Sequence, residues 1–192
     1  MKNVLGRFSQ VMVGAVGGAA LLLSGVGMAS AHVTIKTDQT AAGSYTILTV
    51  GVPHGCEGSP TTRIDISVPE EIETIKPGMN YGWDVEVKRD EAATPAAATP
   101  ESGEHGESSG RISEIIYTAK TPLPDEFYDQ FLLQVKLPSD AEGQTLYFPV
   151  VQTCEEGETA WVQIPAEGQS GEELANPAPS VTITAPQDGA GH

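Results

Sequence analysis

Short stretches in which apolar and polar residues alternate recur along the chain after residue 32. In segment 62–68 isoleucine and valine side chains alternate with charged and hydroxyl side chains, and segment 83–87 repeats this alternation with tryptophan and valine. A period of two is the pattern of a half-buried β-strand. Further strand candidates, rich in β-branched and aromatic residues, are 44–52, 112–118, 131–137, 145–151, 161–164 and 181–183.

Short strands at this spacing, separated by Gly and Pro, predict an all-β fold, and a single-domain β-sandwich is the arrangement we expect. A closed barrel is the alternative, because periodicity does not distinguish the two. No stretch shows a sustained helical period. The best helical candidate, 125–130, would form one or two turns.

The N-terminus has the features of a secretory signal. A basic region precedes an apolar run over 11–28, and Ala29 and Ala31 then occupy the spacing that signal peptidases recognise. The run is long enough to suggest a membrane span, but its glycines dilute the hydrophobicity and the cleavage site follows directly. We therefore predict a cleaved signal peptide over 1–31, with His32 as the first residue of the mature protein.

Cleavage would leave 161 residues, enough for one domain with a core. It would remove Lys2 and Arg7 and leave 8 basic against 26 acidic residues, a net charge of −18. Such a charge argues against nucleic acids and anionic membrane surfaces as partners, since both would repel the protein.

Two segments lack the strand pattern. Residues 91–110 are acidic and carry no large apolar side chain, a composition that predicts a flexible loop. We expect this loop to lie within a single domain over 32–185. Residues 186–192 predict a mobile tail. His105 and His192 lie in these segments and are weak ligand candidates. No second apolar run follows near the C-terminus, so we expect a soluble periplasmic or extracellular protein without a membrane anchor.

The two cysteines, Cys56 and Cys154, predict one disulfide in an exported protein. On the chain-entropy model a loop of this size stabilises the fold by up to about 4–5 kcal/mol. The alternative is a thiolate pair that binds Cu(I), which would need a reducing or protected setting.

An N-terminal histidine could chelate one metal ion through its α-amine and its imidazole Nδ1, which an internal histidine cannot do. If the disulfide fixes the loop around Cys56, the carboxylate of Glu57 could add an oxygen ligand beside His32. Mixed nitrogen and oxygen ligands in a tetragonal arrangement suit Cu(II). Both nitrogens must lose protons to bind, so such a site weakens in acid.

Five blocks in order along the chain resemble the YcnI-like family of exported copper-binding domains. They are the start Ala31-His32-Val33-Thr34, the block VPHGCEGSPT over 52–61, the block LPDEFYDQF over 123–131, the block LYFPVVQTCE over 146–155, and the stretch 161–169. The resemblance covers nearly the whole mature chain. It differs in two ways: many relatives carry a C-terminal membrane helix, and the acidic insert here is longer.

The resemblance implies an immunoglobulin-like or cupredoxin-like β-sandwich that holds Cu(II) in a single-histidine brace. His32 matches the histidine of the brace, Glu57 best matches its glutamate, and Trp161 matches the tryptophan close to the metal, with Trp83 as the alternative. His54 follows Pro53 in a loop, where its imidazole is a candidate for a hydrogen bond within the turn, for direct contact with the metal, or for contact with a metal ligand. A role in copper acquisition, delivery or homeostasis follows, with a copper transporter or copper chaperone as partner.

Two other functions compete with copper binding. A copper monooxygenase that attacks polysaccharides also uses a histidine brace, but completes it with a second, internal histidine. A metal-free structural sandwich is the third possibility. The sequence has no Ser-His-Asp arrangement, phosphate-binding glycine loop or Cys-x-x-Cys motif, so hydrolase, nucleotide and thiol-redox functions are not supported.

Overall fold

A computed structural model describes residues 32–90 and 110–187 of the chain. The predicted signal peptide, nearly all of the predicted loop and most of the predicted tail lie outside these residues, as do His105 and His192. The described strands are β1 (Thr34–Lys36), β2 (Tyr45–Val52), β3 (Thr61–Ser67), β4 (Ile75–Pro77), β5 (Trp83–Arg89), β6 (Ile112–Leu123), β7 (Asp129–Lys136), β8 (Thr145–Tyr147), β9 (Val150–Cys154), β10 (Glu158–Trp161) and β11 (Ser180–Thr182).

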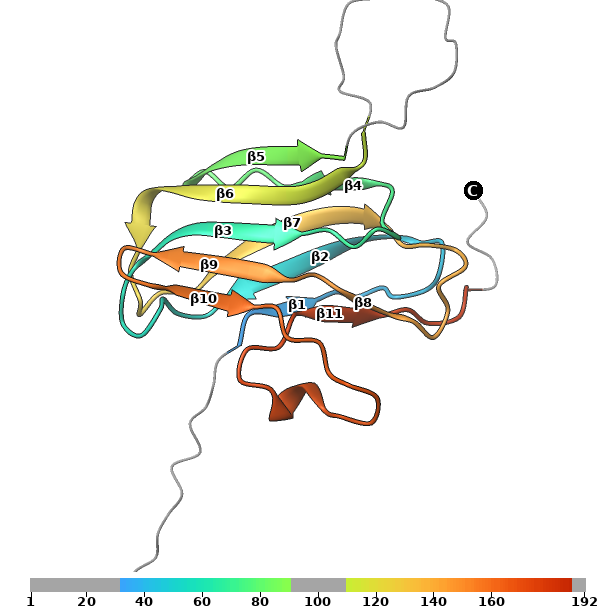
Figure 1. The fold of residues 1–192 in the computed structure, drawn as a ribbon. Helices are drawn as coiled ribbons and strands as arrows, with labels where there is room; N and C mark the ends of the chain where they lie inside the picture. Colours follow the sequence, from blue (N-terminus) through green and yellow to red (C-terminus); the bar gives the residue numbers. More distant parts are fainter. Residues whose placement is uncertain (1–31, 91–109, 188–192) are drawn as a thin grey trace, which may run out of the picture.

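Two antiparallel sheets form the body of the protein. One has the order β1-β2-β7-β4 and the other the order β10-β9-β3-β6-β5, while β11 pairs with β8 in a small third sheet. Figure 1 shows the two large sheets as layers facing each other. The predicted all-β sandwich is confirmed, and the barrel alternative is wrong because each large sheet has two free edges.

Alternation along the strands builds the core between the layers. In β2, Leu48 and Val50 are fully buried, and they pair with Leu133 and Phe131 of β7, which are buried as well. Burying each such side chain stabilises the fold by about 1.5–3 kcal/mol. The preceding residue, Ile47, points outward and is 43% exposed.

Some predicted elements differ from the structure. The strand expected over 145–151 is two strands, because the chain leaves one sheet at Phe148-Pro149 and enters another. The strand expected over 161–164 contributes only Trp161, the last residue of β10. The short β1 and β4 were not predicted. In the described ranges no helix combines the length and apolar character needed to cross a membrane.

The helical candidate 125–130 is also wrong. Its first residues form a turn closed by a hydrogen bond from the Phe127 N–H to the Pro124 carbonyl, and β7 begins at Asp129. The one helix in the part of the chain that the structure describes is a single 3-10 turn, Gly171–Glu173, whose N-cap is Ser170.

The core makes a prediction about stability. Leu48→Ala should lower the free energy of unfolding by about 2–5 kcal/mol, because it removes buried methyl groups and leaves a cavity. The neighbouring Ile47→Ala on the outer face should cost less than about 1 kcal/mol. Denaturant titration of both variants with the disulfide intact measures the difference, and equal losses would contradict this assignment of faces.

Candidate metal centre

Three aromatic rings meet at one end of the sandwich. The Trp161 indole is buried, and the ring centroid of His32 lies 5.7 Å from its centroid at an interplanar angle of 64°. The His54 ring lies 6.4 Å from the same indole at 67°. Both imidazoles are half-buried, so two potential metal ligands share one apolar wall while keeping access to solvent.

Strand pairing explains why the two histidines are close. Thr34 of β1 pairs with Gly51 of β2 in an antiparallel register. Continuing this register by two residues places His32 opposite Pro53, and His54 follows directly. A separation of 22 residues in sequence therefore becomes a short distance at the sheet end.

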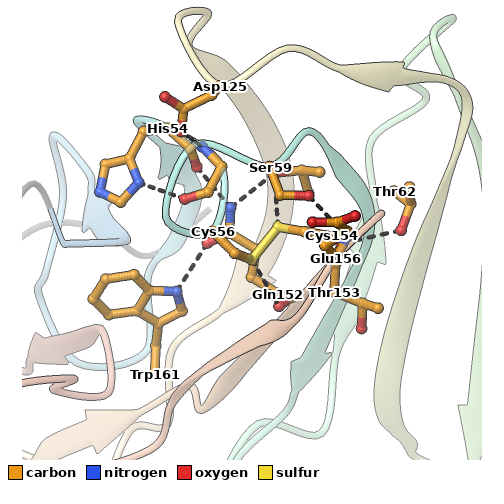
Figure 2. Close-up of a disulfide and its surroundings, with 12 residues drawn as sticks. His54, Cys56, Ser59, Thr62, Asp125, Gln152, Thr153, Cys154, Glu156 and Trp161 are labelled. Atoms are coloured by element: carbon orange, nitrogen blue, oxygen red, sulfur yellow. Dashed lines mark hydrogen bonds between the residues drawn. A yellow bond between two sulfur atoms is a disulfide. The ribbon is translucent and has the colours of Figure 1, made fainter.

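A buried glutamine fixes this arrangement. The Gln152 side chain in β9 is fully buried, and its Nε2 donates to the His54 carbonyl oxygen at 2.6 Å and to the Thr61 hydroxyl at 2.8 Å. Its Oε1 accepts a bond of 3.1 Å from the Trp161 indole Nε1 (Figure 2). One side chain therefore ties the tryptophan to the loop that carries His54.

The imidazole of His54 has a defined orientation. Its Nδ1 lies 2.6 Å from the Gly55 carbonyl oxygen, as Figure 2 shows. A carbonyl oxygen can only accept, so Nδ1 carries the proton and donates it. In the neutral ring this leaves Nε2 with a free lone pair.

The loop after β2 is held at several points. Cys56 and Cys154 form a disulfide with a Cα–Cα distance of 6.0 Å, which confirms the predicted pairing and excludes a Cu(I) thiolate pair. The Gly55 N–H donates to Asp125 Oδ1 at 3.0 Å. A Cβ at Gly55 would lie 1.9 Å from the Ser59 carbonyl oxygen, so only glycine fits this close approach.

Glu57 occupies the tip of a tight hairpin. Cys56 and Ser59 exchange two main-chain hydrogen bonds of 3.0 and 2.9 Å around it, and Glu57 has φ +50°, a left-handed conformation uncommon for a residue with a side chain. It lines a hollow together with Glu155 and Glu156. The groove lined by His32 is a different one, formed with β1 and the segment 177–180.

The two tryptophans have different surroundings. The Trp83 indole Nε1 donates to Asp129 Oδ2 at 2.8 Å, and its ring packs edge-on against Phe131 at 5.0 Å. Trp161 is the one that contacts His32.

The donor set limits how a metal could be held. Among residues 32–90 and 110–187, no three His, Cys, Asp or Glu side chains converge on one point. A metal at His32 therefore needs a further kind of donor. In the full chain the His32 main-chain nitrogen belongs to a peptide bond, and cleavage after Ala31 would convert it into an α-amine.

Comparisons with known proteins identify the family of the described domain. The family model "Domain of unknown function (DUF1775)" matches residues 32–183. The copper-binding protein CutI of Bacillus subtilis is 30% identical over 94 residues, which are 49% of this chain and 45% of CutI, so the match spans less than half of that relative. An uncharacterised Nocardia farcinica protein with an immunoglobulin-like fold is 25% identical with a TM-score of 0.61, over 80% of this chain and 98% of that one.

The glutamine network leads to a test. Gln152→Leu would leave the Trp161 N–H and the His54 carbonyl without their buried partners, at about 1–3 kcal/mol for each group. We expect a loss of at least about 2 kcal/mol in unfolding free energy and faster hydrogen exchange of the Trp161 indole N–H by NMR. Gln134→Leu, at an exposed position of β7, is the control and should change stability by no more than about 0.5 kcal/mol. Equal behaviour of the two variants would contradict the network.

Proposed function

The chain belongs to the DUF1775 family, which is the YcnI family, and from this premise we propose that it is an exported protein that binds Cu(II) at a mature N-terminal His32. The observation that carries the proposal is the place of His32. It is the first residue of the matched domain, and its imidazole lies against the buried Trp161 indole. A relative named as a copper-binding protein supports the choice of metal.

The proposed ligands are the two nitrogens of His32 and an oxygen of Glu57. An α-amine and Nδ1 of one residue close a chelate ring and supply the donor that the described side chains lack. The left-handed backbone of Glu57 supports a function for this residue, because such a conformation costs about 1–3 kcal/mol and is often found at functional sites. Reaching the metal would require the Glu57 side chain to turn from the hollow it lines with Glu155 and Glu156.

Trp161 would form an apolar wall beside the copper. A hydrophobic wall limits water access and lowers the local dielectric, which tunes the bound metal. The Gln152 bond to the indole holds this wall in place.

We further propose that the protein takes part in copper acquisition, delivery or homeostasis outside the cytoplasm. The disulfide supports an oxidising compartment. The acidic chain favours a cation as cargo over a nucleic acid. A copper transporter or chaperone that exchanges the metal with His32 is the expected partner.

The position of the mature N-terminus decides the proposal. Protein that begins at His32 should bind one Cu(II) at least about tenfold more tightly than the same protein with an acetylated N-terminus, because acetylation removes the α-amine as a ligand. Calorimetric titration of the two proteins measures this difference, and the mass of the secreted protein shows where it begins. Equal copper uptake by the two would rule out the brace, and no uptake by either would favour a metal-free structural sandwich.

The enzyme alternative has one observation in its favour, the internal imidazole of His54 beside Trp161. Copper-loaded protein incubated with a reductant and a panel of polysaccharides should release no oxidised oligosaccharides if the protein only binds copper. Mass spectrometry of the soluble products provides the measurement. Oxidised products would replace the binding function by a monooxygenase function.

A further inference from the structure

We infer that His54 is a third nitrogen ligand of the copper at His32, binding through Nε2. This rests on the proposed function and adds a ligand that the single-histidine brace does not contain. The site would then combine three nitrogens, two from His32 and one from His54. Such a set, completed by an oxygen donor, suits the tetragonal preference of Cu(II).

The position of the two imidazoles is the first argument for His54 as a copper ligand. His32 and His54 lie edge-on against the same indole, at centroid distances of 5.7 and 6.4 Å. The pairing of β1 with β2 brings the two main-chain segments together, and both rings then contact Trp161. A metal bound to His32 beside Trp161 would therefore lie near the imidazole of His54.

The hydrogen bonding of His54 gives the second argument. Metal-ligating histidines commonly donate their other ring N–H to a carbonyl oxygen or a carboxylate, which fixes the tautomer and the ring. The His54 Nδ1 already donates to the Gly55 carbonyl at 2.6 Å, leaving Nε2 for a metal. Gln152 and Asp125 hold the carbonyl and the N–H of the peptide group that joins His54 to Gly55, so little conformational freedom of this peptide is left to lose on binding.

The location of Glu57 gives the third argument. Figure 2 shows Glu156 on the opposite side of the disulfide from His54 and Trp161. Glu57 lines a hollow with Glu156, whereas His54 lies on the Trp161 side. Of the two residues in this loop that could complete the site, the imidazole is the one already placed beside the indole.

Pulsed EPR of the Cu(II) protein beginning at His32 tests the inference directly. This method detects the remote nitrogen of a copper-bound imidazole, and combination lines appear when two imidazoles bind. The chain has four histidines, so the measurement is made with His105→Gln and His192→Gln, which leave only His32 and His54. We expect the two-imidazole pattern, and a one-imidazole pattern would overturn the inference.

A variant provides an independent readout. His54→Gln removes the imidazole but keeps an amide that can donate to the Gly55 carbonyl. It should weaken Cu(II) binding by about 10–100-fold or more, because losing a residue that only hydrogen-bonds a metal ligand already costs this much. The pulsed spectrum should change to one imidazole. Glu57→Gln in the same loop tests the oxygen ligand of the proposed brace. The His105→Gln, His192→Gln protein, which keeps His32 and His54, is the control and should bind Cu(II) as tightly as the parent. Unfolding of the metal-free proteins verifies that the variants fold.

The outcomes separate the two proposals. Unchanged copper affinity in His54→Gln, with tight binding by the parent protein, overturns the role of His54 and leaves copper binding at His32 intact. A loss confined to Glu57→Gln does the same and favours the histidine–glutamate brace. If protein beginning at His32 binds no copper, both proposals fall.

Discussion

The arrangement of the site depends on the hydrogen bonds of the buried Gln152 side chain. An amide in an apolar interior is tolerated only when its donors and acceptor find partners, because an unpaired group loses its hydration without compensation. Here the partners are Trp161, Thr61 and the main chain of His54, which come from a strand end, a second strand and a loop. Because these hydrogen bonds form together, they fix the positions of the strand end, the second strand and the loop relative to one another. The surrounding sandwich is the rigid frame.

The loop after β2 acquires its shape from several constraints acting together. The disulfide joins it to the end of β9, Asp125 holds the Gly55 amide, and a tight turn brings the chain back towards β3. None of these contacts lies in a regular ladder. They allow an irregular segment to present an imidazole with a fixed tautomer on one side and acidic side chains on the other.

Local patterns in the sequence were sufficient for much of the fold. Alternation along β3 and β5 predicted strands with one buried and one solvated face, and two cysteines allow a single pairing. The break at Pro149 was missed because the apolar run continues through it while the chain changes sheets.

The importance of Gln152 was missed for a similar reason. Its only signal is a polar residue at a core position of an apolar strand, and its partners come from other parts of the fold. The proximity of His54 to His32 depends on the register between β1 and β2, which no local pattern encodes.

The strand next to His32 is one of the short edge strands of the sandwich. β1 has three residues and lies at the edge of its sheet, with β2 as its one neighbour in that sheet. Short edge segments of this kind open at a small fraction of the global free energy of unfolding. A ligand held at the start of β1 could thus leave when the strand peels away, with the disulfide-bonded body still folded. The lifetime of the bound state would follow local fraying at the edge, and cargo exchange would require no global unfolding.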